Sequence, residues 1–279
     1  MEIYYEGSDG TVIDFTKAPY YTPEPESLLT NSWEYNTISG ANGLGRVKRF
    51  YKDTQEMQLL LSITEDGPEA FNEAMYKLHR TFDRDVRRLK PGKIWWNGFY
   101  KEAFAVIQSN EEFDDILESV EQTVTFISVY PYWVRKRTIT LVPINDQASG
   151  TGLDYDDFDF EHDYGMDTAI EIINNDCIDA ANFEIRFYGP CVNPAITIGS
   201  HVYEILDTIS AGETATINSL TKKVMKYSST GEETNIFHLR GRDDYVFKPI
   251  EEGRQAIGRN KSLRIDVTIF DERGEPVWI

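Results

Sequence analysis

Residues 154–163 read Asp-Tyr-Asp-Asp-Phe-Asp-Phe-Glu-His-Asp, and this stretch says most about how the 279-residue chain is organised. Acidic and aromatic residues alternate there, and an alternation of period two predicts a β-strand with one charged and one aromatic side. So many carboxylates repel one another unless they face water or cations. The stretch also lies between two β-rich halves of different composition, which indicates a role in assembly more than in catalysis.

The length and charge of the chain limit the class of protein. A chain of 279 residues favours two domains, predicted here as residues 1–150 and 151–279, with a small polar linker over residues 148–152. The formal net charge is −19, and both halves are acidic. Because such surfaces repel phosphate, we expect no specific binding of nucleic acid.

The sequence carries no pattern of a membrane span or a signal peptide, and it has few cysteines. No apolar run approaches the length of a membrane span, so we expect no membrane insertion. The N-terminus has acids where a signal peptide has cations, which predicts synthesis and folding in the cytoplasm. Two cysteines, Cys177 and Cys191, are too few for a disulfide scaffold, and we expect free thiols in or near a β core.

The sequence of the first half predicts several strands and one helix. The helix begins near Pro68 and carries an apolar stripe of Phe71, Met75, Leu78 and Phe82. Asn97-Gly98 predicts a tight hairpin turn. The glycine-rich residues 40–45 do not fit a dinucleotide-binding fingerprint and are interpreted as a loop. We also expect a short helix over 111–121, with a charged loop as the alternative. Strands are expected at 12–15, 46–51, 57–63 and 120–130.

The far end of the predicted helix is cationic. Arg84, Arg87, Arg88 and Lys90 complement the negative end of the helix dipole, and Pro91-Gly92 ends the helix. A solvated helix end explains such a cluster without any function. The functional interpretation is a subunit interface that meets carboxylates of the same or an adjacent subunit.

The second half predicts an antiparallel β-sandwich, because short strands follow one another with Gly, Asn, Asp and Ser between them. One pattern there suggests binding. His238, Arg240 and Arg242 alternate, so they are predicted to share one polar strand face, as in many lectins. A solvated sheet face is the alternative. The strands are expected at 169–173, 183–188, 195–198, 202–206, 222–227, 235–239 and 263–270.

Catalytic motifs are missing from the sequence. It contains no His-Glu-x-x-His, Gly-x-Ser-x-Gly or Cys-x-x-Cys pattern. Asp154, Asp156 and Asp159 suggest a calcium loop, but Asp159 occupies the position where that loop needs glycine. We therefore predict no enzyme, no metal and no cofactor. Glycoside hydrolysis by a pair of carboxylates is a distant alternative.

Four segments together resemble the distal tail protein family of long-tailed bacteriophages and prophages. The likeness spans most of residues 40–279. The segments are Phe126–Trp133, the acidic–aromatic run ending in Tyr164-Gly165, Phe187-Tyr188-Gly189-Pro190 followed by Asn193-Pro194-Ala195-Ile196, and the terminal Glu275-Pro276-Val277-Trp278.

The resemblance implies a mainly β protein with one helix in its N-terminal domain. That domain would be split-barrel-like and would form a hexameric ring, and the C-terminal domain would be a galectin-like antiparallel β-sandwich. The implied role is structural: a hub in the virion that connects the tail tube to the tail-tip, baseplate or tail-fibre proteins. The alternative function is a carbohydrate-binding module or host-surface lectin.

Overall fold

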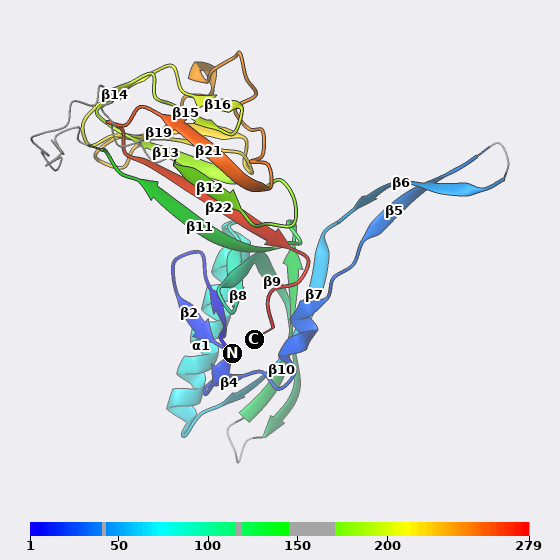
Figure 1. Ribbon diagram of the computed structural model, residues 1–279. Coiled ribbons are helices and arrows are strands. Elements are labelled where there is room, and N and C mark those ends of the chain that lie inside the picture. Colours follow the sequence, from blue (N-terminus) through cyan, green and yellow to red (C-terminus); the bar gives the residue numbers. More distant parts are fainter. Residues whose placement is uncertain (41–42, 115–118, 145–170, 279) are drawn as a thin grey trace, which may run out of the picture. The chain divides into compact units, whose positions relative to one another are not determined.

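The chain forms two compact units in the computed structural model, which describes residues 1–40, 43–114, 119–144 and 171–278 (Figure 1). Unit 1 comprises Met1–Arg135 and Glu272–Ile279, and unit 2 comprises Lys136–Asp271. The chain passes between them within β11 (Trp133–Leu141) and again within β22 (Ile265–Arg273). The acidic–aromatic stretch 154–163 and the predicted boundary at residue 150 lie outside the described residues.

Unit 1 contains two antiparallel sheets that share the 16-residue strand β9 (Phe99–Asp114). The first part of β9 pairs with β8 and the second part with β10, so one strand belongs to both sheets. The strand orders are β2–β1–β8–β9 and β9–β10–β7–β4–β3. The bounds are β1 Ile3–Glu6, β2 Val12–Asp14, β3 Thr16–Lys17, β4 Tyr20–Tyr21, β7 Gln55–Thr64, β8 Gly92–Trp96 and β10 Ser119–Ser128, with a 3₁₀ helix at Pro25–Leu29.

The helix of unit 1, α1 (Pro68–Arg87), covers the core with its predicted apolar stripe. Leu78 and Phe82 are fully buried, and Phe71 and Met75 pack against the same cluster. The rings of Tyr5, Phe82 and Phe126 meet pairwise, with centroids 5.0–5.8 Å apart. The start of the helix at Pro68 and the turn at Asn97-Gly98, whose φ angles are 45° and 79°, are confirmed.

A buried carboxylate ties α1 to the N-terminal strand. Asp85 is completely buried, and its oxygens accept hydrogen bonds from Tyr5 Oη at 2.8 Å and from the backbone N–H of Ser8 at 3.0 Å. Burial and the Asp85 charge raise the pKa of Tyr5. Gly92 permits this contact, because a Cβ there would lie 2.2 Å from Tyr5 Oη.

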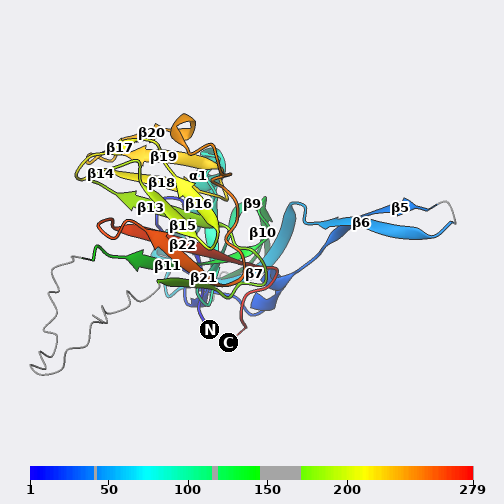
Figure 2. The same cartoon turned by 45° about the horizontal axis from the view of Figure 1, so that its top comes forward.

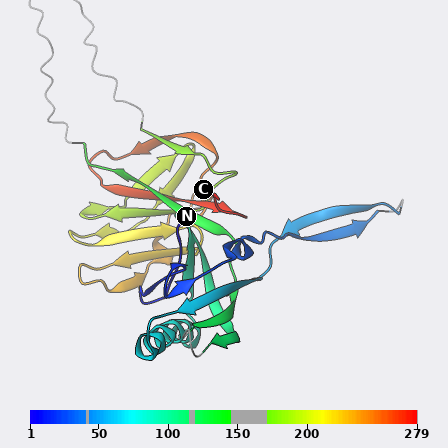
Figure 3. The same cartoon turned by 90° about the horizontal axis from the view of Figure 1, so that it is seen from below.

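Strands β5 (Glu34–Ser39) and β6 (Gly45–Tyr51) form a sheet of their own in unit 1. They pair antiparallel with each other. Every residue of the two strands is exposed except Tyr51, which is half-buried. All three views show this hairpin extending away from the rest of unit 1 (Figures 1–3). The sequence predicted β6 and a loop before it, but not the arm that they form with β5.

Both ends of the chain meet at Asn97 in unit 1. Its side-chain oxygen accepts a hydrogen bond from the N–H of Glu2 at 2.9 Å, and its amide donates to the carbonyl of Trp278 at 3.0 Å. The terminal segment after Asp271 therefore belongs to unit 1, whereas the sequence placed it with the second domain.

Unit 2 is built mainly from two antiparallel sheets around one core, and β14 and β17 pair as a further two-stranded sheet (Figure 2). One sheet has the order β20–β19–β18–β13–β22–β11 and the other β12–β21–β15–β16. Phe183, Ile185 and Val267 of the first sheet share a cluster with Ile196 and Tyr203 of the second. The bounds are β12 Ile172–Asn175, β13 Phe183–Tyr188, β14 Cys191–Val192, β15 Ala195–Ile198, β16 His201–Glu204, β17 Thr208–Ile209, β18 Thr214–Asn218, β19 Lys223–Tyr227, β20 Glu233–Asn235 and β21 Gly253–Arg259.

Two local predictions are wrong. Where a helix was expected over 111–121, residues 111–114 belong to β9 and residues 119–121 to β10, because pairing with β7 outweighs the local apolar spacing. The strand expected at 235–239 is a 3₁₀ helix, Phe237–Leu239, because the side chain of Asn235 accepts the N–H of Phe237 and turns the backbone.

The mainly β fold with one α-helix is confirmed in the described residues, as are most of the predicted strands. Cys177 and Cys191 lie half-buried against the core of unit 2. No helix among the described residues is long and apolar enough to cross a membrane.

Lys101 is fully buried inside unit 1, which is unusual for a cation. Its amine donates to Gln55 Oε1 at 2.9 Å and lies 4.9 Å from the centre of the Trp133 ring. Burial, with a smaller contribution from the charge of Lys52, lowers the pKa of Lys101 from 10.5 to about 7.

We predict that Lys101→Met stabilises unit 1, most strongly near pH 7. Between the folded and unfolded pKa values the unfolded chain binds a proton that the folded chain does not, so the wild-type unfolding free energy rises with pH by up to about 1.4 kcal/mol per unit. The variant lacks this rise, and its advantage should shrink from pH 7 to 10. All five tryptophans lie in unit 1, so urea titrations followed by tryptophan fluorescence report on this unit.

The exposed Lys90 gives the control. Lys90→Met should leave the pH dependence of the wild type unchanged. An advantage of Lys101→Met that is the same at every pH would contradict the assignment of a neutral buried amine.

Candidate interaction surfaces

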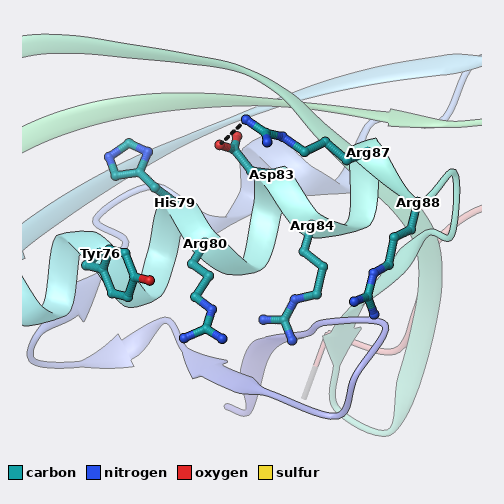
Figure 4. A pocket seen from close by; sticks show the side chains of 7 residues that line it. All are labelled: Tyr76, His79, Arg80, Asp83, Arg84, Arg87 and Arg88. Carbon is teal, nitrogen blue, oxygen red and sulfur yellow. Dashed lines mark ion pairs between the residues drawn. The ribbon is translucent and has the colours of Figure 1, made fainter.

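The second half of α1 presents an arginine surface on unit 1 (Figure 4). Tyr76, Arg80, Arg84 and Arg88 recur every four residues, so they form a ridge along one side of the helix. The ridge borders an open depression of about 550 Å³. We define the arginine surface as the residues that line this depression: Tyr76, His79, Arg80, Asp83, Arg84, Arg87 and Arg88.

The guanidinium groups of this surface differ in their partners. Arg84 is half-buried and forms an ion pair with Asp9. Arg87 is 82% exposed and approaches Asp83 only to 4.0 Å. Arg80 and Arg88 are exposed and form no ion pair with any carboxylate of the described residues.

The structure brings together three of the four predicted cationic residues. Arg84, Arg87 and Arg88 line one depression, whereas Lys90 lies beyond the helix end and lines a neighbouring one. Sequence reasoning missed Arg80 and Tyr76, although the four-residue spacing that continues upstream from Arg84 was a visible signal. Whether these residues form a subunit interface stays a prediction.

The polar strand face predicted in the second half does not exist. His238 lies in the 3₁₀ helix, Arg240 follows it, and Arg242 lies in a bend. Arg240 turns back on this helix, with its guanidinium 4.0 Å from the centre of the Phe237 ring and Nη1 donating to the Phe237 carbonyl at 3.0 Å. The three residues therefore share no strand from which to present one face.

The β5–β6 arm is a second candidate surface, and its two faces differ. Paired strands place opposed residues on the same face, so Tyr35 stands beside Phe50 and Thr37 beside Val47. The paired residues of this first face are uncharged, and Tyr35 and Phe50 are each 62% exposed, while Lys48 is the extra residue at the bulge between the pairs Asn36–Arg49 and Thr37–Val47. The opposite face carries Arg46 and Arg49 among Glu34, Asn36, Ile38 and Tyr51.

The base of the arm is fixed to the body of unit 1. Lys52 follows β6, and its amine lies 5.0 Å from the centre of the Trp33 ring and 5.3 Å from that of Tyr132. The same amine is hydrogen-bonded to the side chain of Asn31. Aromatic rings and a shared cation therefore set the direction in which the arm leaves the core.

Solved structures provide the comparison that sequence comparisons do not. No protein-family model matches the chain, and no curated protein matches it. The Dit protein (gp 19.1) of phage SPP1, described as a paradigm of the hub adsorption apparatus in phages that infect Gram-positive bacteria, is similar with a TM-score of 0.61 and 12% identity. The likeness covers 97% of this chain and 98% of that one. The chain has the fold of the SPP1 Dit protein.

Two structures of the phage P2 baseplate in its activated conformation, one with Ca and one with Sr, contain chains with the same fold. Each gives a TM-score of 0.64 at 13% identity. The likeness covers 100% and 99% of this chain respectively, and 98% of the baseplate chain in both.

The described residues show no arrangement for metal chemistry. Within them, no group of three or more His, Cys, Asp or Glu side chains is placed to hold a metal ion. The calcium loop considered for Asp154, Asp156 and Asp159 lies outside the described residues.

We predict that unit 2 binds sugars weakly or not at all. Unit 2 contains no tryptophan to stack on a sugar ring, since Trp278 belongs to unit 1. Hydrogen bonds between protein and sugar mostly replace hydrogen bonds that both make with water, so they add little net affinity. Calorimetry and a glycan array on the whole protein should show no tight ligand. Tight binding that Arg240→Ala or His238→Ala removes would favour a lectin instead.

We also predict that the arm contributes little to the stability of unit 1. Replacing residues 34–51 by a short Gly-Asn-Gly loop removes strands that pair only with each other, so the unfolding free energy should change by about 0.5 kcal/mol or less. Tryptophan fluorescence during urea titration measures this change. A large loss of stability would show that the arm belongs to the folding core.

Proposed function

We propose that this protein is a distal tail protein that forms a hexameric hub ring at the tail tip of a virion and connects the tail tube to baseplate, tail-tip or tail-fibre proteins. The observation that carries the proposal is the likeness to the SPP1 Dit protein and to chains of the P2 baseplate, which covers nearly the whole of this chain and of each neighbour. The function is geometric, and it requires no catalytic residue.

The β5–β6 arm supports self-association through unit 1. A projecting hairpin with unpaired edges and exposed aromatic rings invites contact with another chain. Three bases and one acid in residues 34–51 give it a net charge of +2, whereas the whole chain carries −19. The surface of a second copy is therefore electrostatically complementary to the arm. A ring in which each arm lies on its neighbour uses this complementarity six times.

The overall charge fits a passage for DNA. A ring of six acidic chains repels phosphate, so a genome passes through it without being retained. The galectin-like character proposed for unit 2 concerns its fold and implies no sugar site. Unit 2 would serve as a platform for the surrounding tail proteins.

The mass of the purified protein in solution tests the proposal. Six copies of a 32.1 kDa chain form a ring of about 193 kDa, which multi-angle light scattering distinguishes from a monomer. Negative-stain electron microscopy should show sixfold rings. A wild-type protein that stays monomeric up to its solubility limit would contradict a ring formed by self-assembly.

We predict that Tyr35→Ser with Phe50→Ser weakens ring formation and leaves the monomer folded. Both side chains are exposed in the single chain, so their removal costs little folding stability but reduces the apolar area that a neighbour can bury. The midpoint concentration for assembly, measured by light scattering, should rise at least tenfold. The matched control is Ile178→Ser with Val192→Ser, which removes two exposed apolar side chains from unit 2 and should leave the midpoint unchanged.

A further inference from the structure

We propose that the arginine surface of α1 binds the acidic–aromatic stretch, residues 154–163, of a neighbouring copy of this chain. The inference rests on the proposed assembly of several copies.

Charge complementarity is the first argument. Residues 77–93 carry seven bases and two acids, and one of these acids, Asp85, is buried and already accepts two hydrogen bonds. Residues 154–163 carry six acids and no Lys or Arg. A strongly cationic helix end and a strongly anionic stretch in the same chain attract each other whenever two copies meet.

Several guanidinium groups of the arginine surface lack a close carboxylate among the described residues. Arg84 forms an ion pair with Asp9, and Arg87 has only a long contact with Asp83. Arg80 and Arg88 have no carboxylate partner in the described part of the chain. Guanidinium groups bind carboxylates in a planar, often bidentate geometry, and several such pairs on one ridge act together. The surface therefore has capacity for added carboxylates.

The spacing of the two partners agrees. Ridge residues four apart on a helix are separated by about 6 Å along its axis. In an extended peptide, alternate residues are about 6.6–6.8 Å apart. Acids occupy four alternate positions of the stretch: Asp157, Asp159, Glu161 and Asp163. Bound in extended form, these carboxylates would follow Arg80, Arg84 and Arg88 along the ridge.

The attachment and length of the stretch set how far it can extend from unit 2. Arg259, whose side chain is 1% exposed, donates to the carbonyl of Val142 at 2.8 Å and to both carboxylate oxygens of Glu171 at 2.6 and 2.7 Å. One guanidinium thus holds both flanks of residues 145–170 together in unit 2. At about 3.3 Å per residue, such a length of chain can extend roughly 40 Å from this anchor and return.

Nucleic acid is the competing polyanion for an arginine surface. The net charge of −19 opposes it, because phosphate would have to approach an acidic protein to reach one cationic helix. The acidic stretch of a second copy is already present at high local concentration in any assembly.

The test is binding of a fluorescent peptide of residues 154–163 to the whole protein, followed by anisotropy at low and physiological salt. Because the endogenous stretch competes, the main titration uses the full chain with Asp157→Asn, Asp159→Asn, Glu161→Gln and Asp163→Asn. This protein should bind the peptide at least tenfold more tightly than wild type. Adding Arg80→Glu and Arg88→Glu should weaken binding at least tenfold, and adding Arg242→Glu and Arg254→Glu, a matched charge change in unit 2, should not.

The outcomes separate this inference from the proposed function, since light scattering on the same samples measures ring formation independently. Peptide binding that depends on Arg80 and Arg88 supports the inference even if no ring forms. Rings without peptide binding overturn it and leave the proposed function standing. Equal binding of a peptide with all six acids amidated, or tighter binding of duplex DNA by the arginine surface, would also overturn it.

Discussion

The buried carboxylate of Asp85 is the constraint on which the arrangement of unit 1 depends. It accepts hydrogen bonds from Tyr5 Oη and from the Ser8 N–H, so it fixes both the position of α1 and its rotation about its own axis. With this rotation Leu78 and Phe82 enter the core and the arginine ridge faces outward. A helix held by apolar packing alone could slide or roll at low cost, whereas a buried polar group satisfied in only one geometry specifies a single arrangement.

The sequence predicts elements whose signals are local. The 68–87 helix has a proline at its start, an apolar stripe and a glycine soon after its end, and Asn97-Gly98 supplies the positive φ angles of a tight hairpin. The prediction for residues 111–121 was wrong because apolar residues at helical spacing imitate a helix, whereas the pairing of β10 with β7 and β9 makes strands of residues 111–114 and 119–121. The strand predicted at 235–239 was wrong because the alternating pattern does not show that the Asn235 side chain accepts a hydrogen bond from the backbone N–H of Phe237.

The candidate surfaces divide in the same way. The cationic end of α1 was predictable because helix periodicity places residues without tertiary information. The arm was not, because its strands satisfy each other and leave apolar side chains in solvent, a pattern that sequence rules assign to a buried sheet. The polar face at 238–242 failed because its residues are tied to local contacts that only the folded chain creates.

The contacts of Arg259 with Val142 and Glu171 determine how sensitive unit 2 is to the length of the chain between these two residues. Arg259 holds the two flanks of residues 145–170 together in unit 2, by a hydrogen bond to the Val142 carbonyl and an ion pair with Glu171. For a flexible segment between two fixed points, the entropy of closure grows only with the logarithm of its length, so doubling that length costs about 0.6 kcal/mol. The Arg259 anchor therefore makes the core of unit 2 insensitive to the length of the chain between Val142 and Glu171, so an insertion there costs little folding free energy.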